Sequence, residues 1–180
     1  MNVLGISGSL RKGSFNSLLL NIAAQAAPEG MEITIADISA FSVYDEDVYA
    51  NGFPAAVATL REQINAADGL LIATPEYNYG MSGVIKNAID WASRPPDQPF
   101  SGKPIALMGA SAGKLGTALA QQQLRQALIG LNGRIVSQPQ VYVSGATRAF
   151  NENGDLNDEA AKGLISQLLG ALRALAGYKK

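Results

Sequence analysis

Three loops of the sequence combine residues that could bind a ligand, and the first runs from Ser7 to Asn16. It holds two glycines, three serines, two cations and an asparagine, and a helical pattern begins within it. Unpaired N–H groups and the helix dipole favour anions at a helix start, and Arg11 would add a charge-assisted hydrogen bond. Ser14 stands where a P-loop would need its lysine, so the loop is not that motif. We predict a phosphate site here; an ordinary turn with a serine helix cap is the alternative.

The second loop, Thr74–Gly83, follows an apolar run and carries two tyrosines separated by an asparagine. Backbone amides and an asparagine can bind the polar edge of a planar heterocycle, and an aromatic ring can cover its face. We therefore interpret Tyr77, Asn78 and Tyr79 as the lining of such a ring, with an exposed turn as the alternative. Glu76 is the acidic residue of this loop, and a chemical role for it is the weaker interpretation because exposed glutamates are common.

The third loop, Gly109–Gly116, consists mainly of small residues. Small residues let a backbone approach a ligand closely, and they equally allow tight packing between a helix and a strand. The sequence leaves both interpretations open. Lys114 within the loop is interpreted as a solvated charge.

The composition limits the chemistry available, because the chain contains neither cysteine nor histidine. Disulfides, thiolate or imidazole zinc sites, and serine–histidine or cysteine–histidine nucleophile pairs are therefore excluded. Redox chemistry would require a bound cofactor that carries the electrons. The acidic segment 44–47 lacks the spacing of a calcium loop, so we expect a solvated loop and no metal site. A net charge of −1 argues against general nucleic-acid binding.

Alternating strands and helices must position these loops, and 180 residues of which 47% are hydrophobic suffice for one domain spanning 1–180. Apolar or alternating runs predict five strands, at 2–7, 32–36, 69–74, 104–110, and 134–136 with 141–143, the last interrupted around Pro139. Helical spacing predicts five helices, near 15–26, 54–67, 84–91, 119–131 and 164–175. This order predicts an α/β fold with a parallel sheet, helices on both faces, and ligands at the carboxyl ends of the strands.

The amino-terminal residues lack the basic segment and small-residue cleavage site of a secretory signal. Apolar runs also stay well below the ~20 residues that a membrane span needs. We therefore expect a cytoplasmic protein that does not enter a membrane.

Taken together, the loops resemble those of the NAD(P)H-dependent FMN reductase family, in particular its bacterial quinone and chromate reductase branch. The matching segments occur in order at 8–16, 74–79, 86–91, and 93–94 through 102–104. The first two motifs are specific in combination. The resemblance extends from about residue 3 to residue 145, and the segment after Ala146 is divergent.

The resemblance implies a flavodoxin-like three-layer fold with strand order 2-1-3-4-5 and a tightly bound FMN. By the family pattern, the phosphate and ribityl chain would be held by Ser9, Arg11, Ser14, Phe15 and Asn16. The isoalloxazine ring would be lined by Pro75, Glu76, Tyr77, Asn78 and Tyr79, and its far side would be closed by Ser111 and Gly113. Hydride transfer from NADH or NADPH to such a flavin needs no acid or base from the protein. Glu76 is then the one weak candidate for a catalytic side chain.

Two functions agree with these features. The first is an enzyme that passes two electrons from NADH or NADPH through FMN to a quinone by a ping-pong mechanism, with chromate as an adventitious acceptor. The second is a flavodoxin-type carrier of single electrons. A nearly neutral charge favours the enzyme, because carriers dock on redox partners through a strong field of one sign. Arg11 also favours it, because the phosphate loop of flavodoxins resembles a serine/threonine–glycine loop without that charge.

The resemblance also implies homodimers or homotetramers with the flavin site near the subunit interface. Tyr44, Tyr49 and Phe53 place aromatic residues between the second predicted strand and the second predicted helix. Interfaces are enriched in aromatic residues, so this segment is a candidate contact. The alternative is that these rings cover the sheet of their own chain.

Overall fold

A parallel sheet of short, apolar strands forms the centre of the computed structural model, which describes residues 1–178. In spatial order its path runs through β2 (Glu32–Ile35), β1 (Asn2–Ser7), β3 (Gly69–Ala73), β6 (Pro104–Ala110) and β7 (Arg134–Ile135). A further strand, β8 (Val141–Val143), also pairs with β6. All residues of β3 and β6 are buried, as expected for central strands covered on both faces.

The predicted α/β class is confirmed, and the strand path is similar to the expected order 2-1-3-4-5 without being identical. The difference lies at the fifth position, which two short strands share. β7 pairs with Pro104 and Ile105, whereas β8 pairs with the end of β6 from Met108 to Ala110. The predicted interruption falls between them at Pro139, which has no N–H group to donate to a ladder.

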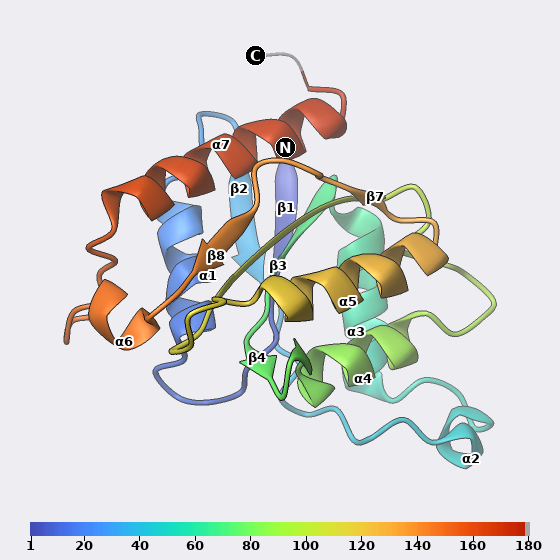
Figure 1. The fold of residues 1–180 in the computed structure, drawn as a ribbon. Helices are drawn as coiled ribbons and strands as arrows, with labels where there is room; N and C mark the ends of the chain where they lie inside the picture. The colour runs from blue at the N-terminus through green and yellow to red at the C-terminus, as the bar shows by residue number, and fades with distance from the viewer. Residues whose placement is uncertain (179–180) are drawn as a thin grey trace.

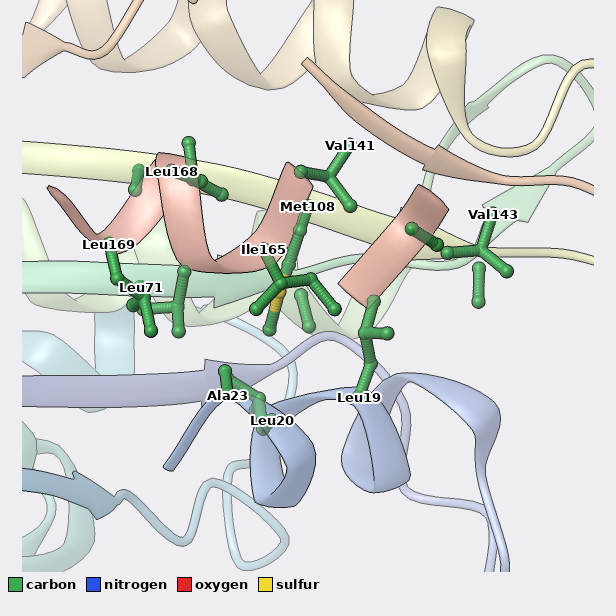
Figure 2. Packing of buried hydrophobic residues seen from close by; sticks show 14 of the residues in the cluster. Leu19, Leu20, Ala23, Leu71, Met108, Val141, Val143, Ile165, Leu168 and Leu169 are labelled. Atoms are coloured by element: carbon green, nitrogen blue, oxygen red, sulfur yellow. The ribbon is translucent and has the colours of Figure 1, made fainter. Parts of the chain in front are cut away.

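The helices α1 (Phe15–Gln25) and α7 (Glu159–Leu175) cover one face of the sheet (Figure 1). Figure 2 shows how their apolar side chains meet those of the strands at this face. The labelled residues of this cluster are Leu19, Leu20 and Ala23 from α1, Ile165, Leu168 and Leu169 from α7, and Leu71, Met108, Val141 and Val143 from the sheet. The strong periodicity of both helices therefore reflects one shared core layer.

The opposite face is covered by α3 (Ala55–Ala66), α4 (Gly83–Ala92) and α5 (Ala118–Gly130). Successive side chains of a strand point to opposite faces, so Leu70 and Ile72 belong to this layer while Leu71 belongs to the other. Trp91 on α4 is fully buried, and its indole N–H donates to the carbonyl of Ser42 at 2.9 Å.

Three short elements were not predicted. They are α2 (Glu46–Tyr49), α6 (Ala146–Ala149), and a hairpin of β4 (Glu76–Tyr77) with β5 (Gly80–Met81) inside the second loop. Elements of two to four residues are too short to show a hydrophobic period. The acidic segment 44–47 thus leads into a helical turn, and within residues 1–178 no group of acidic residues could hold a metal ion. None of the described helices is long and apolar enough to cross a membrane.

Arg61 of α3 is a buried cation that fastens the proline-rich loop after α4. It is only 6% exposed, and its guanidinium donates to the carbonyls of Ala92, of Arg94 at 2.7 Å and of Asp97 at 3.2 Å. Its central carbon also lies 4.2 Å from the centroid of the Phe53 ring. Burial lowers the pKa of Arg61, but a guanidinium stays protonated at neutral pH.

We predict that Arg61→Met destabilises the protein by about 2 kcal/mol, because the buried carbonyl of Ala92 and the carbonyls of Arg94 and Asp97 lose a charged donor. Urea denaturation of variant and parent at equal FMN concentration measures the effect. Arg148→Met is the control, because Arg148 is an exposed arginine. Equal midpoints for all three proteins would contradict the assigned role of Arg61.

Candidate functional site

The carboxyl ends of β1, β3 and β6 open into a cleft of about 780 Å³. Its size falls within the usual range for cofactor sites. The lining contains every site residue predicted from the three loops: Ser9, Arg11, Ser14, Phe15, Asn16, Pro75, Glu76, Tyr77, Asn78, Tyr79, Ser111 and Gly113. Ala110, Ala112 and Thr147 complete it. Thr147 was missed, because it lies on the short helix α6 that the sequence pattern did not reveal.

The first loop brings a cation and a helix start together at one end of the cleft. Ser14 caps α1, and its hydroxyl accepts a hydrogen bond from the N–H of Asn16 at 3.2 Å. The Arg11 guanidinium lies 5.4 Å from the centroid of the Phe15 ring. Among residues 1–178 no carboxylate lies within ion-pair distance of Arg11. The cap that was considered as an alternative is therefore present, and beside it lies a cation available to an anion.

Asn16 has a structural role that the sequence did not indicate. Its buried amide donates to the carbonyl of Ala110 at 3.0 Å and accepts from the N–H of Ala110 at 2.9 Å. These two bonds join the start of α1 to the end of β6. They hold the first and third loops on adjacent sides of the cleft.

The second loop is a tight hairpin whose turn projects aromatic side chains. Asn78 and Tyr79 have φ angles of 51° and 64°, so both central residues of the two-residue turn are left-handed. Asparagine tolerates this region, whereas tyrosine adopts it at a cost of roughly 1 kcal/mol. Tyr77 and Tyr79 are 57% and 72% exposed and lie at the cleft.

Glu76 directs its carboxylate to a helix. One oxygen accepts hydrogen bonds from the N–H groups of Leu119 at 2.9 Å and Ala120 at 3.0 Å, in the first turn of α5. The N-cap residue Thr117 makes no side-chain capping bond, so Glu76 performs that function from outside the helix. The sequence offered no signal for this contact, which joins residues more than forty positions apart.

The two interpretations of the third loop apply to different glycines. At Gly109 a Cβ atom would clash with the Thr117 hydroxyl and the Thr74 carbonyl, so this glycine serves tight packing. At Gly113 the nearest atom would be the Ser111 hydroxyl at 3.7 Å, which leaves the backbone open to the cleft. Lys114 is exposed and does not line the cleft, as expected for a solvated charge.

Comparisons with known proteins agree with this site. The family model described as NADPH-dependent FMN reductase matches residues 1–148. An NAD(P)H-dependent FMN reductase of Pseudomonas aeruginosa is 60% identical over 173 residues, which cover 96% of this chain and 94% of that protein. A quinone reductase of Escherichia coli is 40% identical over 182 residues, covering 99% and 95% of the two chains. The structure of FerB, a flavoenzyme NAD(P)H:(acceptor) oxidoreductase from Paracoccus denitrificans, superposes with a TM-score of 0.88 at 34% identity, covering 98% and 97%.

Fold and site thus define a flavodoxin-like α/β flavoprotein. The chain belongs to the NADPH-dependent FMN reductase family. It is an oxidoreductase that uses FMN with NADH or NADPH as the electron donor.

The cleft fits FMN in size and in chemistry. The Arg11 cation beside a helix start, with no ion-pair partner in the described part of the chain, suits the phosphate, and exposed tyrosines on a hairpin suit a flat ring. At Gly113 the backbone is not covered by a side chain of its own, so a ligand in the cleft can approach it closely. Among residues 1–178, Arg11 and Glu76 are the charged residues of the lining, and the Glu76 carboxylate faces α5.

We predict that Arg11→Ala raises the dissociation constant of FMN roughly tenfold or more, because a charge-assisted hydrogen bond to phosphate is lost. Titration of apoprotein with FMN measures the change. Turnover of the FMN-saturated variant should fall much less, because the phosphate lies far from the reacting ring.

Lys12→Ala is the matched control, since Lys12 is a neighbouring exposed cation that does not line the cleft. Equal FMN affinity in Arg11→Ala and the parent would remove Arg11 from the phosphate site.

Proposed function

We propose that this protein catalyses the transfer of two electrons from NADH or NADPH, through FMN, to quinones. One observation carries the proposal: the first loop, with Arg11, and the aromatic hairpin, with Tyr77 and Tyr79, line the same cleft. The relative named quinone reductase, which is 40% identical along nearly the whole chain, supports the acceptor class. Chromate and free flavin are adventitious acceptors in this proposal, because the chemistry is set by the cofactor.

In the proposed complex, residues 1–180 form one FMN-binding domain. The phosphate and ribityl chain contact Ser9, Arg11, Ser14, Phe15 and Asn16. The ring lies against Pro75, Glu76, Tyr77, Asn78 and Tyr79, and Ser111 and Gly113 approach it from the far side. Bound FMN supplies the hydride chemistry. The chain itself binds and orients the ring, and backbone N–H groups near its polar edge stabilise negative charge there.

In this proposal no side chain needs to transfer a proton during hydride transfer. The chain contains no histidine or cysteine, and one oxygen of the Glu76 carboxylate accepts from two N–H groups of α5. Donor and acceptor use the same open face of the ring in turn, which is a ping-pong mechanism. The same proposal places the enzyme in the cytoplasm, where its nicotinamide donors are found.

The simplest test is the absorbance spectrum of the purified protein, followed by NAD(P)H oxidation with benzoquinone. A flavin spectrum with rapid oxidation supports the proposal. A flavin spectrum without acceptor turnover would instead favour a single-electron carrier.

For the mechanism we predict parallel lines in double-reciprocal plots against NAD(P)H and quinone. We also predict that the reductive half-reaction, followed by stopped flow, varies little between about pH 6 and pH 8. Intersecting lines would show that both substrates bind together. A steep pH dependence that disappears in Glu76→Gln would show that this side chain transfers a proton.

We further propose that the protein is a homodimer or homotetramer, with contacts that include the segment 44–53 and the adjoining Val43. The rings of Tyr44 and Trp91 are 4.9 Å apart, and those of Tyr49 and Phe53 are 5.2 Å apart, so the rings pack within the chain. Tyr44, Tyr49 and Phe53 nevertheless remain partly exposed, and Val43 is 82% exposed beside them. An apolar surface of this kind is better covered by a second copy.

Light scattering at micromolar concentration should therefore give at least twice the monomer mass. Val43→Glu should shift the distribution toward the monomer, because a charge would enter the interface. A monomeric parent protein would exclude the proposed self-association.

A further inference from the structure

The hairpin β4–β5 is too small to hold its own shape. It consists of two strands of two residues each, joined by a turn with two left-handed residues. Isolated two-stranded hairpins are marginally stable at best, and Tyr79 adds a conformational cost. Other parts of the chain must therefore hold it in place.

The first attachment is the Glu76 carboxylate on β4. It accepts from the N–H groups of Leu119 and Ala120 at the start of α5. A negative charge at this position also matches the positive end of the helix dipole. The contact stabilises the helix and the hairpin together.

The second attachment is Gln123, one turn farther along α5. Its side-chain oxygen accepts from the N–H of Met81 on β5 at 3.1 Å. Gly80 makes this approach possible, because a Cβ atom there would lie 2.7 Å from the same oxygen. Since Glu76 and Met81 are register partners, the two attachments act on the same rung of the hairpin, one on each strand.

We propose that Glu76 and Gln123 form a hairpin clamp that positions the flavin-lining turn on α5. In this view they are positioning residues, and Glu76 does not act as an acid or base. The clamp fixes Tyr77, Asn78 and Tyr79 against the ring, so it sets the ring's environment and its reduction potential. The inference rests on the proposed location of the ring at this hairpin.

The clamp is tested with FMN-loaded Gln123→Ala, Glu76→Ala and Glu76→Gln. The readouts are the visible spectrum and reduction potential of the bound flavin, and the FMN dissociation constant. Loss of one hydrogen bond in Gln123→Ala should raise the dissociation constant several-fold and shift the spectrum and the potential. Glu76→Ala should have the larger effect, and Glu76→Gln should recover part of it, because an amide oxygen can still accept both bonds.

Gln122→Ala is the matched control. Gln122 is the same residue type on the same helix, it is exposed, and it does not line the cleft. Because Gln123→Ala alters no charge, a shifted potential in that variant cannot come from the loss of a carboxylate.

Gly80→Ala provides a second, independent test. Its Cβ atom should displace the flexible Gln123 side chain and so remove the same hydrogen bond. Gly80→Ala and Gln123→Ala should therefore each shift the spectrum, and the double variant should be no worse than Gln123→Ala alone. Both single variants keep the proposal testable if Glu76→Ala fails to fold.

The proposal is overturned if Gln123→Ala matches Gln122→Ala in spectrum, potential and FMN affinity. It is also overturned if the thermal midpoint falls while spectrum and potential stay unchanged, which would indicate a purely structural contact. Failure of the proposed function is a separate result: the parent would then bind FMN without reducing benzoquinone, and the spectral comparison would still test the clamp.

Discussion

Complete burial of β3 and β6 is the constraint on which the rest of the structure depends. Helices must cover both faces of these strands, so polar chemistry is confined to the two ends of the sheet. At the amino end, polar side chains are used to satisfy the backbone. The Asp68 carboxylate accepts from the N–H of Asn2 at 2.6 Å, and the Lys103 ammonium donates to the carbonyl of Ala67 at 2.6 Å. The cleft lies at the other end of the sheet, where the strands β1, β3 and β6 end.

Three loops at that end become one site because polar side chains link them. Asn16 joins the first loop to the third through Ala110. The buried Ser82 hydroxyl donates to the carbonyl of Gly8 at 2.6 Å, which joins the second loop to the first. Ser82 also caps α4, and Asn16 lies in the first turn of α1, so the same side chains contribute to the local structure and to the site.

Much of the fold and the lining of the cleft could be predicted from the sequence. Helices such as α7 show a strong apolar period, and β3 is a continuous apolar run, so local physics identifies them. The parallel arrangement then places the ends of β1, β3 and β6 together, which is why the predicted loop residues share one cleft. The hairpin β4–β5 and the contacts of Asn16 and Glu76 could not be predicted. The hairpin is too short for a period, and the contacts join residues that are far apart in the chain.

The same separation explains why the sequence does not show what Glu76 contacts. A carboxylate in the second loop is a weak candidate for acid–base chemistry, and one of its oxygens accepts from the N–H groups of α5. A flavin performs hydride transfer without a protein acid or base, so this chain can use Glu76 of the cleft for attachment. The left-handed Tyr79 fits the same logic, because an unfavourable backbone conformation persists only where surrounding contacts fix it. In this cleft the side chains of the protein supply geometry, and the reactivity belongs to the cofactor.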